Sequence, residues 1–193
     1  MIRPIIAYGD PVLRKKAVEI DEDYPDLNSL LEDMFETMYN SQGVGLAAPQ
    51  IGLSIRIFIV DAAPFVDEDE EDVEGLRDFK RVFINPIIIE ETGKEWKFEE
   101  GCLSIPGIRE DVSRQPDLIV EYYNEKFELI EEKLTGLPAR IVQHEYDHIE
   151  GVLFTDKINP LKKQLLKGKL NDIAKGNVKV NYRMKFPLVK GKQ

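Results

Sequence analysis

Two histidines and a glutamate form the most chemically informative pattern in this sequence. His144 and His148 are the only histidines in the chain, and Glu145 follows the first of them. On a helix, a spacing of four residues places both imidazoles on one face, where two ring nitrogens can bind one metal ion. The pattern His-Glu-x-x-His therefore predicts a metallohydrolase site. The alternative is a pair of partly exposed helix histidines that bind nothing.

A third ligand is needed, because a catalytic zinc-type ion normally takes three protein ligands and keeps one position for water. The sequence has no third histidine, so the third ligand must be an acid or the single cysteine, Cys102. Its thiolate is a strong metal ligand, and Gly101 and Pro106 on either side suggest a sharply positioned segment after a strand. We therefore favour Cys102 over the alternative of a small buried hydrophobic residue.

Helices and one glycine-rich segment are expected to position this chemistry. The histidines belong to a helix expected to begin near Pro138 and to end before Gly151. Apolar residues recur at spacings of three and four over residues 26–40, which predicts an amphipathic helix, and a further helix is predicted over residues 157–175. The almost uncharged segment 43–52 alternates glycine with small apolar residues, so something must pack closely against it.

Runs of β-branched and aromatic residues predict strands at 55–60, 82–89 and 118–123. Residues 127–134 are expected to pair back as a hairpin, and residues 178–186 to add a short final strand. The six consecutive acids at 67–72 predict a solvated loop. The sequence thus predicts an α+β fold, with antiparallel strands packed around a central metal-binding helix and a C-terminal helix.

Length and composition indicate one folded domain, residues 1–193. Hydrophobic residues make up 42% of the chain and charged residues 32%, which excludes the profile of a disordered protein. No apolar run approaches the roughly 18 to 20 residues that cross a bilayer, and no secretory signal precedes the first turn. A lone cysteine excludes an internal disulfide. We therefore expect a cytoplasmic protein without membrane contact.

The net charge of −10 is unevenly distributed along the chain. Residues 157–193 hold 11 of the 26 basic residues and one of the 36 acidic residues. The acidic remainder disfavours nucleic-acid binding in general, and we expect no specific DNA partner. The basic end could contact a polyanion such as RNA, or lie across its own acidic body. We divide the chain into a catalytic core of about 1–156 and a basic C-terminal helix and tail, 157–193.

Three segments together resemble the motifs of the peptide deformylases, in the order and separation that this family shows. They are residues 43–50 (GVGLAAPQ), 100–106 (EGCLSIP) and 143–148 (QHEYDH). The similarity covers residues 1 to about 160. It implies a metal-dependent amidohydrolase that removes the formyl group from the N-terminal formyl-methionine of newly synthesised polypeptides.

The resemblance also implies catalytic roles. Cys102, His144 and His148 would bind one divalent ion per chain, iron(II) in vivo, with zinc, nickel or cobalt as alternatives. Glu145 would take a proton from the water on this ion and pass it to the departing amine.

The developing oxyanion would be stabilised by the metal, the side-chain amide of Gln50 and the backbone N–H of Leu103. Other residues would bind the substrate through backbone hydrogen bonds or enclose its methionine side chain. These substrate-binding residues are Val44, Gly45, Gly101, Leu103, Arg109, Leu137 and Ile141. In some deformylases a basic C-terminal helix contacts the ribosome, so residues 157–175 are a candidate for that contact.

Two other functions would use the same metal site. A metallopeptidase would cleave internal peptide bonds, such as those of casein, without hydrolysing formyl peptides. A non-enzymatic interaction domain would need a fourth ligand to close the site, and only an acid could supply it.

Overall fold

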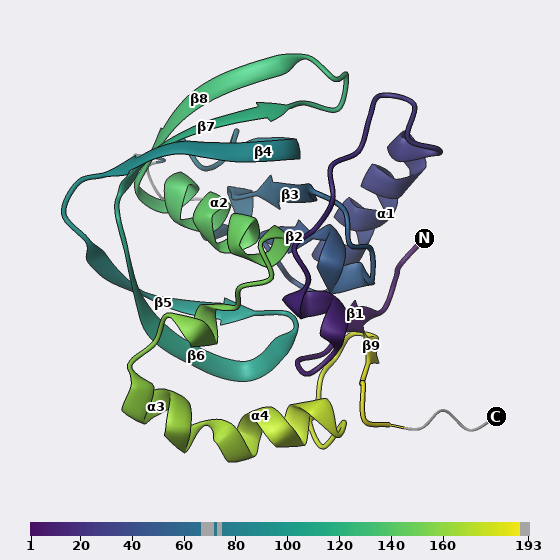
Figure 1. Ribbon diagram of the computed structural model, residues 1–193, viewed down its shortest axis with the longest axis vertical. Coiled ribbons are helices and arrows are strands. Elements are labelled where there is room, and N and C mark those ends of the chain that lie inside the picture. Colours follow the sequence, from purple (N-terminus) through teal and green to yellow (C-terminus); the bar gives the residue numbers. More distant parts are fainter. Residues whose placement is uncertain (67–71, 73–74, 190–193) are drawn as a thin grey trace.

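Helix α2 (Gly136–Ile149) lies at the centre of the molecule, between a five-stranded sheet on one side and the hairpin of β5 (Trp96–Cys102) and β6 (Ile105–Arg114) on the other (Figure 1). The computed structural model describes residues 1–66, 72 and 75–189. Most of the acidic run predicted as a loop at 67–72 lies outside the described residues. The arrangement confirms the predicted α+β fold with strands around the central helix.

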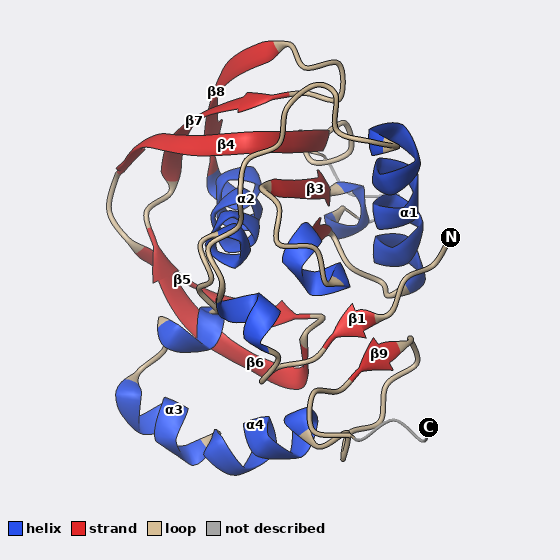
Figure 2. Cartoon of the chain, turned by 45° about the vertical axis from the view of Figure 1, so that its right-hand side comes forward, coloured by secondary structure: helices blue, strands red, loops and turns tan. Residues whose placement is uncertain are grey.

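Further strands and helices complete the fold (Figure 2). The other strands are β1 (Ile5–Ile6), β2 (Gly45–Ala47), β3 (Ile57–Asp61), β4 (Lys80–Thr92), β7 (Asp117–Tyr123), β8 (Leu129–Thr135) and β9 (Met184–Lys185). The other helices are α1 (Leu27–Asn40), α3 (Pro160–Leu165) and α4 (Lys167–Ala174). Short 3₁₀ turns lie at Pro11–Arg14, Ala48–Ile51, Ala63–Phe65 and Phe154–Asp156.

The large sheet is antiparallel throughout, in the order β2-β3-β4-β7-β8. The strands predicted at 55–60, 82–89 and 118–123 are confirmed as β3, β4 and β7 with small shifts of their ends. The predicted hairpin is β7–β8, in which Val120 lies opposite Glu132. Strand β2 is the end strand of this sheet, so within the described residues its outer edge pairs with no other strand of the sheet.

The pairings β5–β6 and β1–β9 were not predicted from the sequence. Strand β6 alternates buried apolar residues with charged ones and pairs with β5 from Trp96↔Arg114 to Cys102↔Ile105. The final strand, expected over 178–186, is only β9, which pairs in parallel with β1. This pairing joins the C-terminal segment to the start of the chain.

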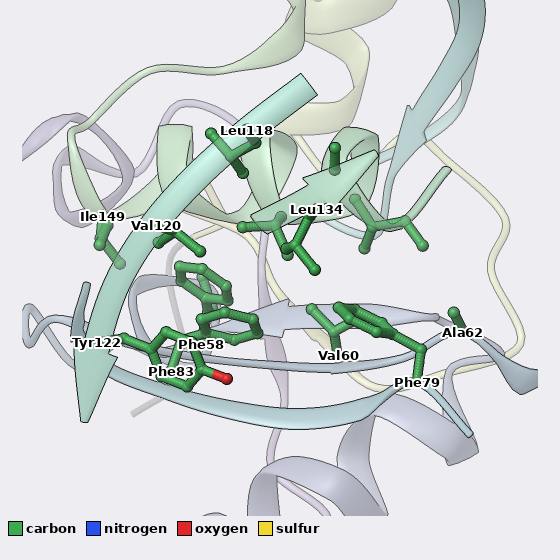
Figure 3. Close-up of a cluster of buried hydrophobic side chains, with 14 of the residues drawn as sticks. Phe58, Val60, Ala62, Phe79, Phe83, Leu118, Val120, Tyr122, Leu134 and Ile149 are labelled. Carbon is green, nitrogen blue, oxygen red and sulfur yellow. The ribbon is translucent and has the colours of Figure 1, made fainter. Parts of the chain in front are cut away.

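The core beside α2 is built on a stack of aromatic rings. Phe58 of β3 and Phe83 of β4 have ring centroids 4.6 Å apart, and Phe83 and Tyr122 of β7 are 4.3 Å apart (Figure 3). The buried α2 residues Val142 and Ile149 belong to the same cluster. Large aromatic side chains bury much apolar area, so this stack fixes the position of α2 on the sheet.

The single C-terminal helix predicted over residues 157–175 is wrong, because the chain forms two helices that meet at Leu166. Asn159 caps α3 by accepting a hydrogen bond from the Leu161 N–H, and Pro160 occupies the first helical position. The bend leaves Leu161 and Leu165 exposed. Four other apolar residues of this region are buried against β6 and its surroundings: Ile158, Leu166, Leu170 and Ile173.

Within the described residues, no helix has the length and apolar character needed to cross a membrane.

Asp156 anchors the turn after α2 and should make stability depend on pH. Burial opposes its charge, but hydrogen bonds from Arg14, Lys163 and the Leu153 N–H outweigh this and lower the pKa of Asp156 to about 2 from an ordinary value of 3.8. Because the folded-state pKa is depressed, the stabilisation is complete above about pH 4 and is lost as the pH falls towards 2.

We expect Asp156→Asn to lower the free energy of unfolding by about 1 kcal/mol at neutral pH. Urea unfolding at several pH values should show the difference from wild type shrinking between pH 4 and pH 2. Asp172→Asn, at an exposed acid of α4, is the control. A pH-independent difference would contradict the assignment.

Candidate metal centre and active-site cleft

Helix α2 positions three of the predicted site residues on one face. It begins at Gly136, which follows β8 with a φ of +59°, a conformation that glycine adopts without strain. His144, Glu145 and His148 lie in its second half, and the His144 and His148 rings are 5.1 Å apart between centroids. The apolar residues of α2 pack against the large sheet, so the histidines face the β5–β6 hairpin.

The hairpin brings Cys102 to these histidines. The β5–β6 pairing shifts register between Gly101 and Cys102, where the chain turns tightly into β6. One potential ligand atom from each of Cys102, His144 and His148 lies within 4.8 Å of the others. The Cys102 Sγ is 3.4 Å from His148 Nε2. The three predicted ligands, from two distant segments of the chain, therefore converge on one point.

The donor set fits a divalent ion. Bond lengths of about 2.3 Å to sulfur and 2.0 to 2.1 Å to nitrogen put tetrahedral ligand atoms roughly 3.5 Å apart, close to the observed sulfur–nitrogen separation. Burial and the neighbouring His144 hold the pKa of His148 well below its ordinary value, so its imidazole is neutral and can donate a lone pair. His144 uses Nδ1 in a hydrogen bond, which leaves Nε2 for an ion.

Glu100 holds His144 in this orientation. Its Oε2 is 2.8 Å from His144 Nδ1, and its Oε1 accepts hydrogen bonds from Arg114 Nε at 2.6 Å and Arg140 Nη1 at 2.9 Å. Asp147 accepts a further hydrogen bond from Arg114. Glu100, Arg114 and Arg140 side chains are each at most 4% exposed. Two carboxylates and two guanidinium groups therefore form one hydrogen-bonded network behind His144.

The electrostatics of this network favour positive charge at the ligand site. Burial disfavours a charged Glu100, but hydrogen bonds from His144 and Arg114 outweigh it and hold the pKa of Glu100 far below its usual range. Burial likewise opposes the charged form of His144, but hydrogen bonds with Cys102 and Glu100 raise the pKa of His144. The anions that would stabilise an imidazolium here also stabilise a metal ion.

Glu145 is a buried carboxylate that lies against the backbone of β2. Its side chain is directed at Gly45 of β2, where a Cβ atom would overlap the carboxylate. Among the described residues, none offers a hydrogen bond to Glu145 Oε2. Burial raises the pKa of Glu145 to about 7. A carboxyl group of this kind can exchange a proton near neutral pH.

The amide of Gln50 has a defined orientation. Its Oε1 accepts a hydrogen bond from the Ala47 N–H at 2.9 Å, so its Nε2 points the other way, to 3.4 Å from Cys102 Sγ and 3.3 Å from Ser104 Oγ. Gln50 is 2% exposed. The Gln50 side chain therefore presents a fixed N–H donor beside the ligand site, and a fixed donor of this kind can stabilise an oxyanion.

A cavity of about 1020 Å³ is lined by most of the residues predicted for the site. His148 is 1% exposed and lies beneath its floor. Arg109 is at the rim and forms an ion pair with Glu99 at 2.9 Å, with both side chains about 60% exposed. The predicted residues on its wall are Val44, Gly45, Gln50, Gly101, Cys102, Leu103, Arg109, Leu137, Ile141, His144 and Glu145.

Several residues of this region were not predicted. The network behind His144 consists of Glu100, Arg114 and Arg140. The one sequence signal for this network is the position of Arg140, four residues before His144 on the same helix. Phe65 and Phe98 line the cavity. Residues 179–182, from the C-terminal segment, also line it, and no sequence pattern pointed to them.

The family model for polypeptide deformylases matches residues 2–164 of the chain. The peptide deformylase of Christiangramia forsetii is 60% identical over 193 residues, which cover 98% of each chain. That of Salinibacter ruber is 43% identical over 182 residues, 94% of this chain and 93% of its own.

Solved structures agree with this match. The peptide deformylase of Legionella pneumophila superposes with a TM-score of 0.78 at 38% identity, over 92% of this chain and 98% of its own. That of Thermotoga maritima has a TM-score of 0.72 at 40% identity, over 83% of this chain and 99% of its own.

Replacing Glu100 should weaken metal binding. Glu100→Gln removes the charge that orients His144, and the loss of such a supporting partner typically costs roughly 10- to 100-fold in metal affinity. Competition with a chelator, followed by metal analysis, measures this. Thermal unfolding should also shift down, because two buried guanidinium groups lose their anion.

Glu99→Gln is the matched control, since Glu99 is adjacent, exposed and, among the described residues, forms its ion pair with exposed Arg109. Glu100→Asp, which keeps the charge, should retain more metal than Glu100→Gln. Wild-type metal retention by folded Glu100→Gln would overturn the role given to this carboxylate.

Proposed function

The chain belongs to the peptide deformylase family, whose members remove the N-terminal formyl group of nascent peptides by metal-dependent hydrolysis, and we propose that Cys102, His144, His148 and Glu145 carry this reaction. The observation behind this assignment is that three ligand atoms converge at the floor of one cleft, beside a buried carboxylate whose Oε2 has no hydrogen-bond partner among the described residues. The site also has a cleft wall of small residues that suits an extended peptide.

A divalent ion held by Cys102, His144 and His148 would supply Lewis acidity, which makes water nucleophilic near neutral pH and polarises the formyl oxygen. We propose iron(II) as the ion in the cell. Zinc, nickel and cobalt are the alternatives that the same sulfur and nitrogen donors accept.

Glu145 moves the proton. Its carboxylate accepts a proton from the attacking water and returns it to the nitrogen of the departing amine. A pKa raised by burial suits both transfers, because neither protonation state is strongly favoured. Gly45 keeps space for this carboxylate, which lies against its backbone.

Gln50 and Leu103 stabilise the charge that develops on the formyl oxygen. The Gln50 amide is held by the Ala47 N–H with its Nε2 directed to the site. The backbone N–H of Leu103 lies in the β5–β6 turn directly after the ligand Cys102. Fixed donors of this type favour the transition state over the planar substrate.

The substrate peptide runs between the open edge of β2 and strand β5. Val44 and Gly45 on one side, and Gly101 and Leu103 on the other, provide backbone groups for hydrogen bonds, as in strand addition. Leu137 and Ile141 of α2 contact the methionine side chain, and Arg109 at the rim contacts a carbonyl further along the peptide.

The C-terminal helices provide a surface for a polyanion. We assign the catalytic core to residues 1–156 and ribosome contact to the basic tail, 157–193. Lys167 and Lys169 are exposed on α4, beside the exposed leucines Leu161 and Leu165 of α3. Because formylated nascent chains emerge from ribosomes, we propose a cytoplasmic location for the enzyme.

Formate release tests the proposed function. Anaerobically purified protein carrying about one metal ion per chain should release formate from formyl-Met-Ala-Ser and leave acetyl-Met-Ala-Ser intact. Glu145→Gln should lower kcat at least about 100-fold, because the proton carrier is lost, while the metal content stays unchanged.

Glu131→Gln, the same chemical change at an exposed position of β8, should keep full activity. Glu145→Gln with activity near that of wild type would contradict its role. A metal-loaded wild-type protein that cleaves casein but releases no formate would contradict the function itself.

Ribosome association should depend on α4. The double variant Lys167→Glu/Lys169→Glu should sediment less with purified bacterial ribosomes, and added salt should weaken wild-type binding, because the attraction is electrostatic. Lys94→Glu/Lys97→Glu makes the same change of net charge at exposed lysines outside the C-terminal helices, before and within β5. Equal, salt-independent binding by all three proteins would overturn this contact.

A further inference from the structure

The C-terminal segment reaches the active-site cleft although it lies outside every motif. Residues 179–182 line the same cavity as Gln50, Cys102 and Glu145. These residues follow the two C-terminal helices and are more than 75 positions from Cys102 in sequence. Their presence at the cleft therefore depends on a tertiary contact of the tail.

Strand β9 supplies that contact. Its parallel pairing with β1 places Met184 opposite Ile5, and the Arg183 carbonyl accepts a hydrogen bond from the Ile5 N–H at 2.9 Å. The Lys185 carbonyl accepts another from the Ala7 N–H at 2.9 Å. The chain immediately before β9 is thereby held beside the start of the protein (Figure 2).

Tyr182 connects this segment to the turn that follows Cys102. Its hydroxyl donates a hydrogen bond to the Leu103 carbonyl at 2.8 Å. Its ring is half-buried against the apolar cluster that includes residues of α1. Burial and negative charge at Cys102 raise the pKa of Tyr182 to about 12, so the hydroxyl remains a donor at neutral pH.

The residue after Leu103 in this turn also forms hydrogen bonds. The Ser104 carbonyl accepts a hydrogen bond from the Tyr8 N–H at 2.8 Å, and the Ser104 hydroxyl accepts one from Gln50. Among the residues that the structure describes, Tyr182 is the one whose side chain bonds to the Leu103 backbone. The Leu103 carbonyl belongs to the rigid peptide plane between residues 103 and 104, and the Leu103 N–H belongs to the preceding plane. Only the φ and ψ rotations of Leu103 separate these two planes, so fixing the carbonyl narrows the directions that the Leu103 N–H can take.

We propose that Tyr182 is a positioning residue for deformylation, which acts through the Leu103 carbonyl to keep the Leu103 N–H directed at the oxyanion. The inference rests on the proposed function, in which Leu103 is an oxyanion donor. It assigns a role in the reaction to the C-terminal segment, beyond any contact with the ribosome.

Tyr182→Phe tests this role, because it removes the hydroxyl and keeps the ring. Loss of an oxyanion donor costs 100- to 1000-fold in kcat, and loosening one should cost less, about tenfold. KM for formyl-Met-Ala-Ser should change less than about twofold, because the oxyanion exists only in the transition state. Rates are normalised to bound metal, and thermal unfolding is measured on the same samples.

Tyr123→Phe is the matched control, since Tyr123 is also half-buried against the same apolar cluster but lies outside the cleft wall. It should keep wild-type kcat. A Tyr182→Phe protein with kcat per bound metal within twofold of wild type would overturn the proposal. So would a loss of kcat matched by Tyr123→Phe.

The experiment distinguishes failure of the role given to Tyr182 from failure of the proposed function. If wild-type protein with a full metal site releases no formate, the deformylase assignment fails and the role of Tyr182 fails with it. If wild type is active and Tyr182→Phe is equally active, only the role of Tyr182 fails.

Discussion

A single buried carboxylate joins the parts of the chain that make the site. Glu100 lies at the end of β5, Arg114 at the end of β6, and Arg140 and His144 on α2, and all three partners contact its two oxygens. A buried charge is stable only when it is paired and fully hydrogen-bonded. The network therefore fixes the hairpin relative to the helix, and this in turn fixes the distance between the thiol of the hairpin and the imidazoles of the helix.

Small residues allow the chemistry to sit at the edge of a sheet. Gly45 has no side chain, so the carboxylate of Glu145 packs on the β2 backbone beside the cleft. Gln50 follows in the next turn, with its amide held by the backbone of Ala47. The segment around these residues is buried on its sheet side and open on its cleft side, which explains a sequence that is both uncharged and rich in glycine. The same open strand edge can receive an extended peptide.

Local patterns in the sequence predicted the parts of the fold that are regular. Periodicity and composition predicted helices α1 and α2 and strands β3, β4, β7 and β8. The spacing of His144 and His148 predicted that both would face one metal ion. Strand β6 was not, because its charged residues around Arg109 interrupt the apolar pattern. The C-terminal helix was predicted as one piece, since its leucines keep a helical spacing even where Leu166 ends the first helix. The contact between Glu100 and Arg140 leaves no local signal beyond the position of Arg140 four residues before His144, and the return of Tyr182 to the cleft leaves none.

The account depends on one ion being held by a thiolate and two imidazoles. X-ray absorption spectroscopy at the metal edge of the loaded protein measures this directly. It should show one sulfur at about 2.3 Å and two nitrogens of imidazole at about 2.0 to 2.1 Å, with any remaining ligand being a light atom. A first shell of nitrogen and oxygen alone, with no sulfur, would contradict the arrangement of Cys102, His144 and His148 around one ion.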